Sequence, residues 1–162
     1  MKFKTVLLLA LVLSAKVNGQ GPAETIPVFN FLKQDKSSFT NKNLATGKVL
    51  FFVFFDTECD HCQRAIADIN RNVKEFNKTA VYLLSLDNKE KVNNFLNTFG
   101  PSLRGKSNIT LLQDVNNEFV RKFRPRKYPS LFLFSSKREL LLYDDNEQNI
   151  FRFIQLIKSN SK

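Results

Sequence analysis

The clearest hydrophobic pattern in the chain is an unbroken apolar run over residues 49–55. The run is rich in aromatic and β-branched residues and is too short for a buried helix, so it predicts a strand covered on both faces. Apolar residues then recur at spacings of three, four and three, at Ile66, Ile69, Val73 and Phe76. That spacing predicts one face of a helix over residues 60–76.

The following segment repeats this alternation of strand and helix. Residues 80–86 form a second apolar run, which predicts a buried strand parallel to the first and reached by a right-handed crossover. Asp87 and Glu90 have the spacing of a capping box, and Gly100-Pro101 is a stop signal. Between them lies a helical face of apolar residues: Val92, Phe95, Leu96 and Phe99.

Weaker patterns surround this β-α-β unit. Residues 26–32 predict an early strand, for which Pro27 favours an edge position, whereas residues 39–44 are too polar to assign. Residues 109–112 predict a short strand. A short helix over residues 115–123 would then turn Val115, Phe119 and Phe123 inward.

The end of the chain predicts a hairpin followed by a helix. Residues 130–134 and 139–143 are two apolar runs joined by a short polar turn. Asp145 and Gln148 suggest a cap for the final helix. The inward residues of that helix would be Ile150, Phe151, Ile154 and Ile157.

Length and composition favour a single globular domain over residues 20–162. The 162 residues include 17 phenylalanines and no tryptophan, which predicts a core built largely from Phe with Leu, Ile and Val. The first 19 residues differ, because two lysines precede a short apolar segment over residues 6–13. That arrangement is typical of a cleaved signal peptide with a cut after Gly19, and the apolar segment is far short of the ~20 residues that a spanning helix needs.

The chain carries a formal charge of +10 at pH 7. Removal of residues 1–19 would take away Lys2, Lys4 and Lys16 and leave a basic domain. We interpret this charge mainly as an aid to solubility. Export and the lack of a recognisable binding motif argue against nucleic acid as a partner.

The only two cysteines, Cys59 and Cys62, fall on the first turn of the helix predicted after the central strand. Free amide N–H groups and the positive end of the helix dipole would stabilise a thiolate at Cys59. Cys62, three residues on, lies within reach of a disulfide. The alternative is a structural staple, which an oxidising compartment permits, although so short a ring gains little entropy.

The order of these elements resembles the thioredoxin-like superfamily, an α/β fold with a central mixed sheet flanked by helices. Exported thiol:disulfide oxidoreductases of the TlpA-like, redoxin-related branch look closest. The resemblance runs over residues 26–157 and is carried by Phe54-Phe-Asp-Thr-Glu-Cys59-Asp-His-Cys62 and by Lys127-Tyr-Pro129-Ser-Leu-Phe-Leu-Phe134.

This resemblance assigns roles to the dithiol and to a proline. It implies that Cys59 attacks, that Cys62 resolves, and that the redox-active disulfide between them works without a bound cofactor. Pro129 would be the cis-proline whose loop, with Tyr128, faces the dithiol and binds substrate backbone. An ordinary trans turn proline is the alternative.

Three positions depart from the family pattern. Glu58 stands where a tryptophan is usual, Val53 where thioredoxins bury an acid, and Ala65 where many TlpA-like proteins have a glutamate. The usual proton carriers are therefore missing.

Several charged residues near the cysteines are candidates for tuning the thiolate. His61, the only histidine, would stabilise it, whereas Asp56, Glu58 and Asp60 would oppose it unless they are simply solvated loop residues. A metal site is disfavoured, because Cys59, His61 and Cys62 would be its only candidate ligands.

A basic tract over residues 121–127 precedes Tyr128. Through the family fold it would approach the dithiol, where Arg124, Arg126 and Lys127 could steer acidic substrates. The alternative is a solvated turn.

These observations favour an exported, periplasmic or secreted thiol:disulfide oxidoreductase that exchanges disulfides with protein substrates. It would need a membrane or soluble redox partner and would not remain inserted in a membrane. The alternative is a non-catalytic thioredoxin-fold binding module with a vestigial or structural disulfide. A peroxidase is disfavoured, because Asp56 stands where that class needs a threonine, three residues before Cys59.

Overall fold

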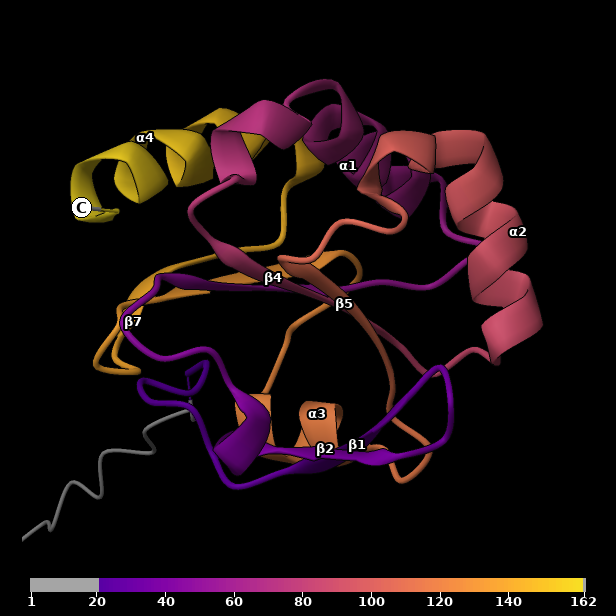
Figure 1. Ribbon diagram of the computed structural model, residues 1–162, viewed down its shortest axis with the longest axis horizontal. Coiled ribbons are helices and arrows are strands. Elements are labelled where there is room, and N and C mark those ends of the chain that lie inside the picture. Colours follow the sequence, from indigo (N-terminus) through magenta and orange to yellow (C-terminus); the bar gives the residue numbers. More distant parts are fainter. Residues whose placement is uncertain (1–20, 162) are drawn as a thin grey trace, which may run out of the picture.

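The computed structural model describes residues 21–161, which form one seven-stranded sheet in the order β2-β1-β5-β4-β3-β6-β7 (Figure 1). The strands are β1 Asn30–Lys33, β2 Ser38–Thr40, β3 Leu50–Phe54, β4 Ala80–Ser85, β5 Ile109–Gln113, β6 Ser130–Phe134 and β7 Leu140–Asp144. The α-helices are α1 Asp60–Arg71, α2 Lys89–Phe99, α3 Glu118–Phe123 and α4 Ile150–Asn160. Short 3₁₀ helices are η1 Asn41–Asn43, η2 Val73–Phe76, η3 Pro101–Leu103 and η4 Glu147–Asn149. The predicted signal peptide lies outside the described residues.

The centre of the sheet is the predicted β-α-β unit. Strand β3 pairs in parallel with β4, and β4 pairs in parallel with β5, while β6 runs antiparallel to β3. Every residue of β3 and β4 is buried, as expected for strands covered on both faces. The thioredoxin-like mixed sheet is therefore confirmed.

Helices cover the two faces of the sheet unequally. Helices α1, α2 and α4 lie on one side of the central strands and α3 on the other (Figure 1). The α3 side is packed mainly with aromatic rings: Phe29, Phe31, Phe39, Phe52, Phe54, Tyr82, Phe119, Phe123, Phe132 and Phe134. The predicted phenylalanine-rich core is thus concentrated on that side.

Two predicted elements end or lie elsewhere than expected. The helix over residues 60–76 ends at Arg71, and after Asn72 the chain continues as η2, which still buries Phe76. The early strand begins only at Asn30 and is not an edge strand, because β2 covers it. Pro27 precedes the strand, so it removes no ladder hydrogen bond.

The caps and inward faces of the shorter helices also differ from the prediction. Val115 is 50% exposed, because the chain turns through a left-handed Asn117 before α3 begins at Glu118. Helix α2 is capped by Asn88 rather than Asp87. In α4 the inward residue is Phe153, whereas Phe151 is 65% exposed.

The segment before α4 is likewise not capped as expected. The side chain of Asn146 accepts from the Gln148 amide, and neither Asp145 nor Gln148 provides the cap. None of the helices within residues 21–161 combines the length and the apolar composition needed to cross a bilayer.

Candidate functional site

Cys59 is the N-cap residue of α1, directly after the loop that leaves β3. Its Sγ accepts a hydrogen bond from the Cys62 amide at 3.4 Å, and its carbonyl accepts from the Gln63 amide. The side chain is partly exposed. The sulfur therefore sits where free amides and the helix dipole favour negative charge, as the sequence predicts.

Cys62 lies in the first turn of α1 and is fully buried. Burial raises the pKa of its thiol. A hydrogen bond with the backbone of Asp56 opposes that effect only in part. Both cysteines are free thiols in this structure. The two sulfurs are thus unequal, one accessible and the other buried and protonated at neutral pH.

The bond between Tyr128 and Pro129 is cis, as predicted. Ser130, the next residue, pairs with Phe54. Tyr128 and Pro129 therefore lie beside the end of β3 that leads to Cys59. The Tyr128 ring packs on Phe54 with centroids 4.8 Å apart, and burial raises the pKa of Tyr128 to about 12. The proline loop and the dithiol therefore meet at the same end of the sheet.

Asp87 supports the loop between β3 and Cys59. Its Oδ2 accepts from the Thr57 amide at 3.0 Å and from the Thr57 hydroxyl at 2.8 Å. The Ser85 hydroxyl donates to the same oxygen at 3.3 Å. The carboxylate that the sequence suggested as a helix cap instead ties the dithiol loop to the end of β4.

Glu58 and Asp60, the predicted acidic tuning residues, point largely into solvent. Glu58 Oε1 lies 2.9 Å from Lys91 Nζ, and both side chains are more than half exposed. The hydrogen bond to Glu58 raises the pKa of Lys91. Asp60 is exposed at the first position of α1, where a carboxylate complements the helix dipole.

His61 contacts a carboxylate that the sequence did not reveal. Its Nδ1 lies 2.8 Å from Oε1 of Glu147 in η4, and Arg64 Nε donates to the same oxygen at 3.1 Å. The Glu147 side chain is only 10% exposed. Desolvation opposes its ionisation, but hydrogen bonds from His61, from its own amide and from Arg64 outweigh that cost and hold the pKa of Glu147 below its usual value.

The predicted basic docking tract is partly neutralised within the domain. Arg126 Nε lies 2.8 Å from Asp145 Oδ2, Lys127 Nζ lies 3.8 Å from the other oxygen, and the Arg126 guanidinium stacks over Tyr143. Arg124 is the left-handed residue that ends α3. Arg126 and Lys127 nevertheless keep most of their side-chain surface exposed.

The two positions at which the resemblance leads one to expect an acid lie in the hydrophobic core. Val53 and Ala65 are fully buried, one in β3 and the other in α1. Among residues 21–161 there is also no group of three or more His, Cys, Asp or Glu side chains that could hold a metal ion.

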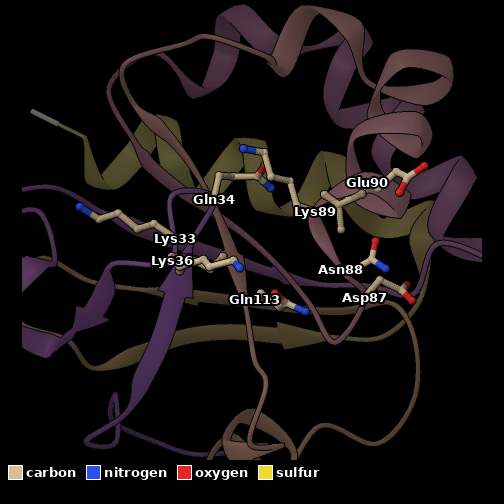
Figure 2. A pocket seen from close by; sticks show the side chains of 10 residues that line it. Lys33, Gln34, Lys36, Asp87, Asn88, Lys89, Glu90 and Gln113 are labelled. Carbon is tan, nitrogen blue, oxygen red and sulfur yellow. The ribbon is translucent and has the colours of Figure 1, made fainter.

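A cavity of about 200 Å³ lies beside the start of α2 (Figure 2). Its lining comes from the β1–β2 turn, from residues 87–92 and from the end of β5. Asp87 lines the cavity and also supports the dithiol loop, whereas neither cysteine lines the cavity. The cavity is therefore a neighbour of the dithiol and not its substrate groove.

Three solved structures with the same fold illustrate the similarity. A putative protein disulfide isomerase from Bacteroides thetaiotaomicron is 20% identical, with a TM-score of 0.67 over 85% of this chain and 88% of that chain. A putative thiol:disulfide interchange protein DsbE from Chlorobium tepidum is 16% identical, with a TM-score of 0.67 over 85% and 97%. Peroxidoxin BcpB from Mycobacterium tuberculosis is 13% identical, with a TM-score of 0.68 over 85% and 96%.

At these identities the likeness shows the fold. No match was found among curated proteins. The model of the AhpC/TSA family, however, matches residues 22–143, which is well over half of the chain. The protein therefore belongs to the AhpC/TSA family, within the thioredoxin-like superfamily of thiol oxidoreductases.

Proposed function

We propose that the protein is an exported thiol:disulfide oxidoreductase that exchanges disulfides with protein substrates through Cys59 and Cys62. The observation that carries this proposal is the inequality of the two sulfurs. Cys59 is accessible at the helix N-terminus, whereas Cys62 is buried with a raised pKa. Such a pair suits a nucleophile and a resolving thiol.

In the reducing direction, the Cys59 thiolate attacks one sulfur of a substrate disulfide. A Cys59–substrate bond forms, and the other substrate sulfur leaves as a thiolate that takes up a proton. Cys62 then loses its proton and attacks Cys59, which releases the second substrate sulfur as a thiol. Two electrons pass from the dithiol to the substrate, and the oxidising direction reverses these steps.

The remaining parts of the site receive roles that fit this exchange. The backbone at Tyr128 and Pro129 would bind the substrate chain next to the disulfide, because both residues lie at the end of β3. Arg126 and Lys127 remain candidates for docking acidic substrates through their exposed surface. A membrane or soluble redox partner would restore the dithiol, and the apolar segment over residues 6–13 supports export.

The test is insulin reduction with dithiothreitol as the electron source, followed as turbidity. The purified chain should accelerate it, and Cys59→Ser should remove the acceleration. Cys62→Ser should instead trap a mixed disulfide with the substrate, visible as a mass increase that a reductant reverses. Wild-type protein that neither reduces insulin nor refolds a scrambled disulfide protein by disulfide exchange would refute the proposal.

A second candidate is a binding module that keeps the fold without turnover. The observation behind it is that Val53 and Ala65 leave no acid at the two family positions. For such a module, the wild type and the Cys59→Ser variant should bind substrate peptides with equal affinity, and neither should exchange disulfides.

A hydrogen peroxide assay tests the peroxidase class. That class needs a threonine at the position of Asp56. The nearby Thr57 hydroxyl is held by Asp87.

A further inference from the structure

Glu147 is the most buried carboxylate that meets the dithiol helix. It belongs to η4, more than 80 positions along the chain from His61, and its side chain is 10% exposed. Its Oε1 contacts both His61 Nδ1, at 2.8 Å, and Arg64 Nε, at 3.1 Å. We propose that Glu147 is a positioning residue that fixes the tautomer and the proton of His61 beside Cys59. This inference deepens the proposed function and rests on it.

Two contacts compete for Nδ1 of His61. An ionised carboxylate only accepts hydrogen bonds, so the contact with Glu147 at 2.8 Å needs a proton on Nδ1. Arg64 Nη2 also lies 2.8 Å from Nδ1, and a guanidinium only donates, so that contact would instead need a bare Nδ1. The Arg64 side chain is 54% exposed and can turn this N–H toward water, whereas the Glu147 side chain is 10% exposed, so we assign the proton to Nδ1 and leave Nε2 bare in the neutral ring. This is the reverse of the tautomer that imidazole prefers in water.

The same contact makes the proton of His61 depend on Glu147. The carboxylate is withdrawn from water while the ring is 61% exposed, so the carboxylate is the fixed partner and the imidazole the group that exchanges protons with solvent. His61 lies between the two cysteines in the first turn of α1. Its charge therefore alters the stability of the Cys59 thiolate.

The charged groups around His61 come from α1 and from the segment before α4. In α1 they are Asp60 and Arg64, with the titratable thiols of Cys62 and of the N-cap Cys59, and in η4 the group is Glu147. The neighbouring acids of that segment are engaged elsewhere. Asp144 binds Arg152, and Asp145 binds Arg126. Glu147 is thus the carboxylate of this segment that reaches the dithiol helix.

This arrangement offers a substitute for what the family positions lack. Val53 and Ala65 place no titratable group beside the cysteines. The pair of His61 and Glu147 brings a proton-carrying ring to the same turn of α1, held from another element of the fold. Loss of Glu147 should therefore change the pH dependence of Cys59 through His61 and not through the fold.

The test exploits the fact that His61 is the only histidine. In reduced, untagged protein, ¹⁵N chemical shifts of its ring should show Nδ1–H in the neutral form. In Glu147→Gln the share of the Nε2–H tautomer should rise, because a neutral amide oxygen holds Nδ1–H less strongly than a carboxylate does. Glu75→Gln, which removes an η2 carboxylate paired with Lys158 of α4, is the matched control and should leave the tautomer unchanged.

A second readout follows the iodoacetamide reaction of Cys59 across pH. Glu147→Gln should change this profile in the wild-type background and leave it unchanged in the His61→Ala background. The proposal is overturned if the wild-type ring carries its proton on Nε2. It is also overturned if Glu147→Gln leaves the tautomer unchanged, or alters Cys59 equally in the His61→Ala background. Neither readout requires turnover, so a failure of insulin reduction remains a separate result.

Discussion

On the α2 side of Cys59, Glu58 pairs with Lys91, and these side chains are 79% and 53% exposed. On the η4 side, His61 pairs with Glu147, whose side chain is 10% exposed. The two pairs have almost the same distance, 2.9 Å against 2.8 Å. Water screens the first pair, whereas the second is anchored by a carboxylate that also binds Arg64. Proximity to a reactive sulfur is therefore a poor guide to influence on it, and burial of one partner is a better one.

Asp87 adds a third contact on the α2 side, and it differs from Glu58 in the same way. It is four-fifths buried, and it accepts from Thr57 twice and from Ser85 once. Figure 2 shows it at the start of α2, with its neighbour Asn88. The α2 side thus has one anchored acid that supports the loop and one solvated acid that does not.

The largest effect should come from Asp87→Ala. The change leaves the Thr57 amide and hydroxyl without their acceptor, and hydrogen bonds to charged groups contribute about 1.5–3 kcal/mol. We expect a loss of that order in the free energy of unfolding, measured by urea denaturation, with faster iodoacetamide labelling of Cys59 as its loop loosens. Asp87→Asn keeps one acceptor oxygen and should lose less. A loss below about 0.5 kcal/mol in Asp87→Ala would show that the loop does not depend on this carboxylate.

The next effect is the acid dependence that Glu147 contributes. Its pKa is held below the usual value in the folded protein, so ionised Glu147 stabilises the fold above the unfolded-state value of about 4.3. That stabilisation is lost as the pH falls through the lower folded value. Wild type should therefore exceed Glu147→Gln by about 1 kcal/mol in urea unfolding at pH 7 and by little at pH 3.

Glu75→Gln is the control for this pH series. Its partner Lys158 and its own side chain are both more than a third exposed, so no comparable difference is expected at either pH. A gap between wild type and Glu147→Gln that stays constant from pH 7 to pH 3 would point to packing and not to ionisation.

The sequence predicts those parts of this site that depend on short stretches of the chain. The run into β3, the 3.6-residue period of α1 and the spacing of Cys59 and Cys62 each lie within one short window. The resemblance adds the cis bond at Pro129, which no local pattern would have suggested. These features place the dithiol at the end of the central strand.

The contacts that distinguish the two sides of Cys59 join residues far apart in the sequence or depend on tertiary structure, so no short stretch of the chain predicts them. Glu147 meets His61 only because β7 returns the chain to the start of α1, and no spacing in the sequence marks that meeting. Asp87 fits a capping pattern, yet Thr57 competes successfully for its carboxylate, and Asn88 caps α2 instead. A short polar side chain has several possible local partners, and tertiary structure chooses among them.

The smallest effect should come from Glu58→Gln. Exposed ion pairs contribute about 0–1 kcal/mol, and Glu58 and Lys91 are both solvated, so unfolding in urea should change by less than about 0.5 kcal/mol. Removal of a negative charge next to Cys59 should raise its rate of alkylation slightly at low ionic strength, and 0.5 M salt should abolish that difference because the Debye length falls to a few ångströms. Lys91→Ala, which leaves the acid without its cation, should shift the rate in the opposite direction. A salt-resistant change in either variant would mean that this pair acts on the sulfur through the loop and not through solvent, and the contrast between the two sides of Cys59 would then fail.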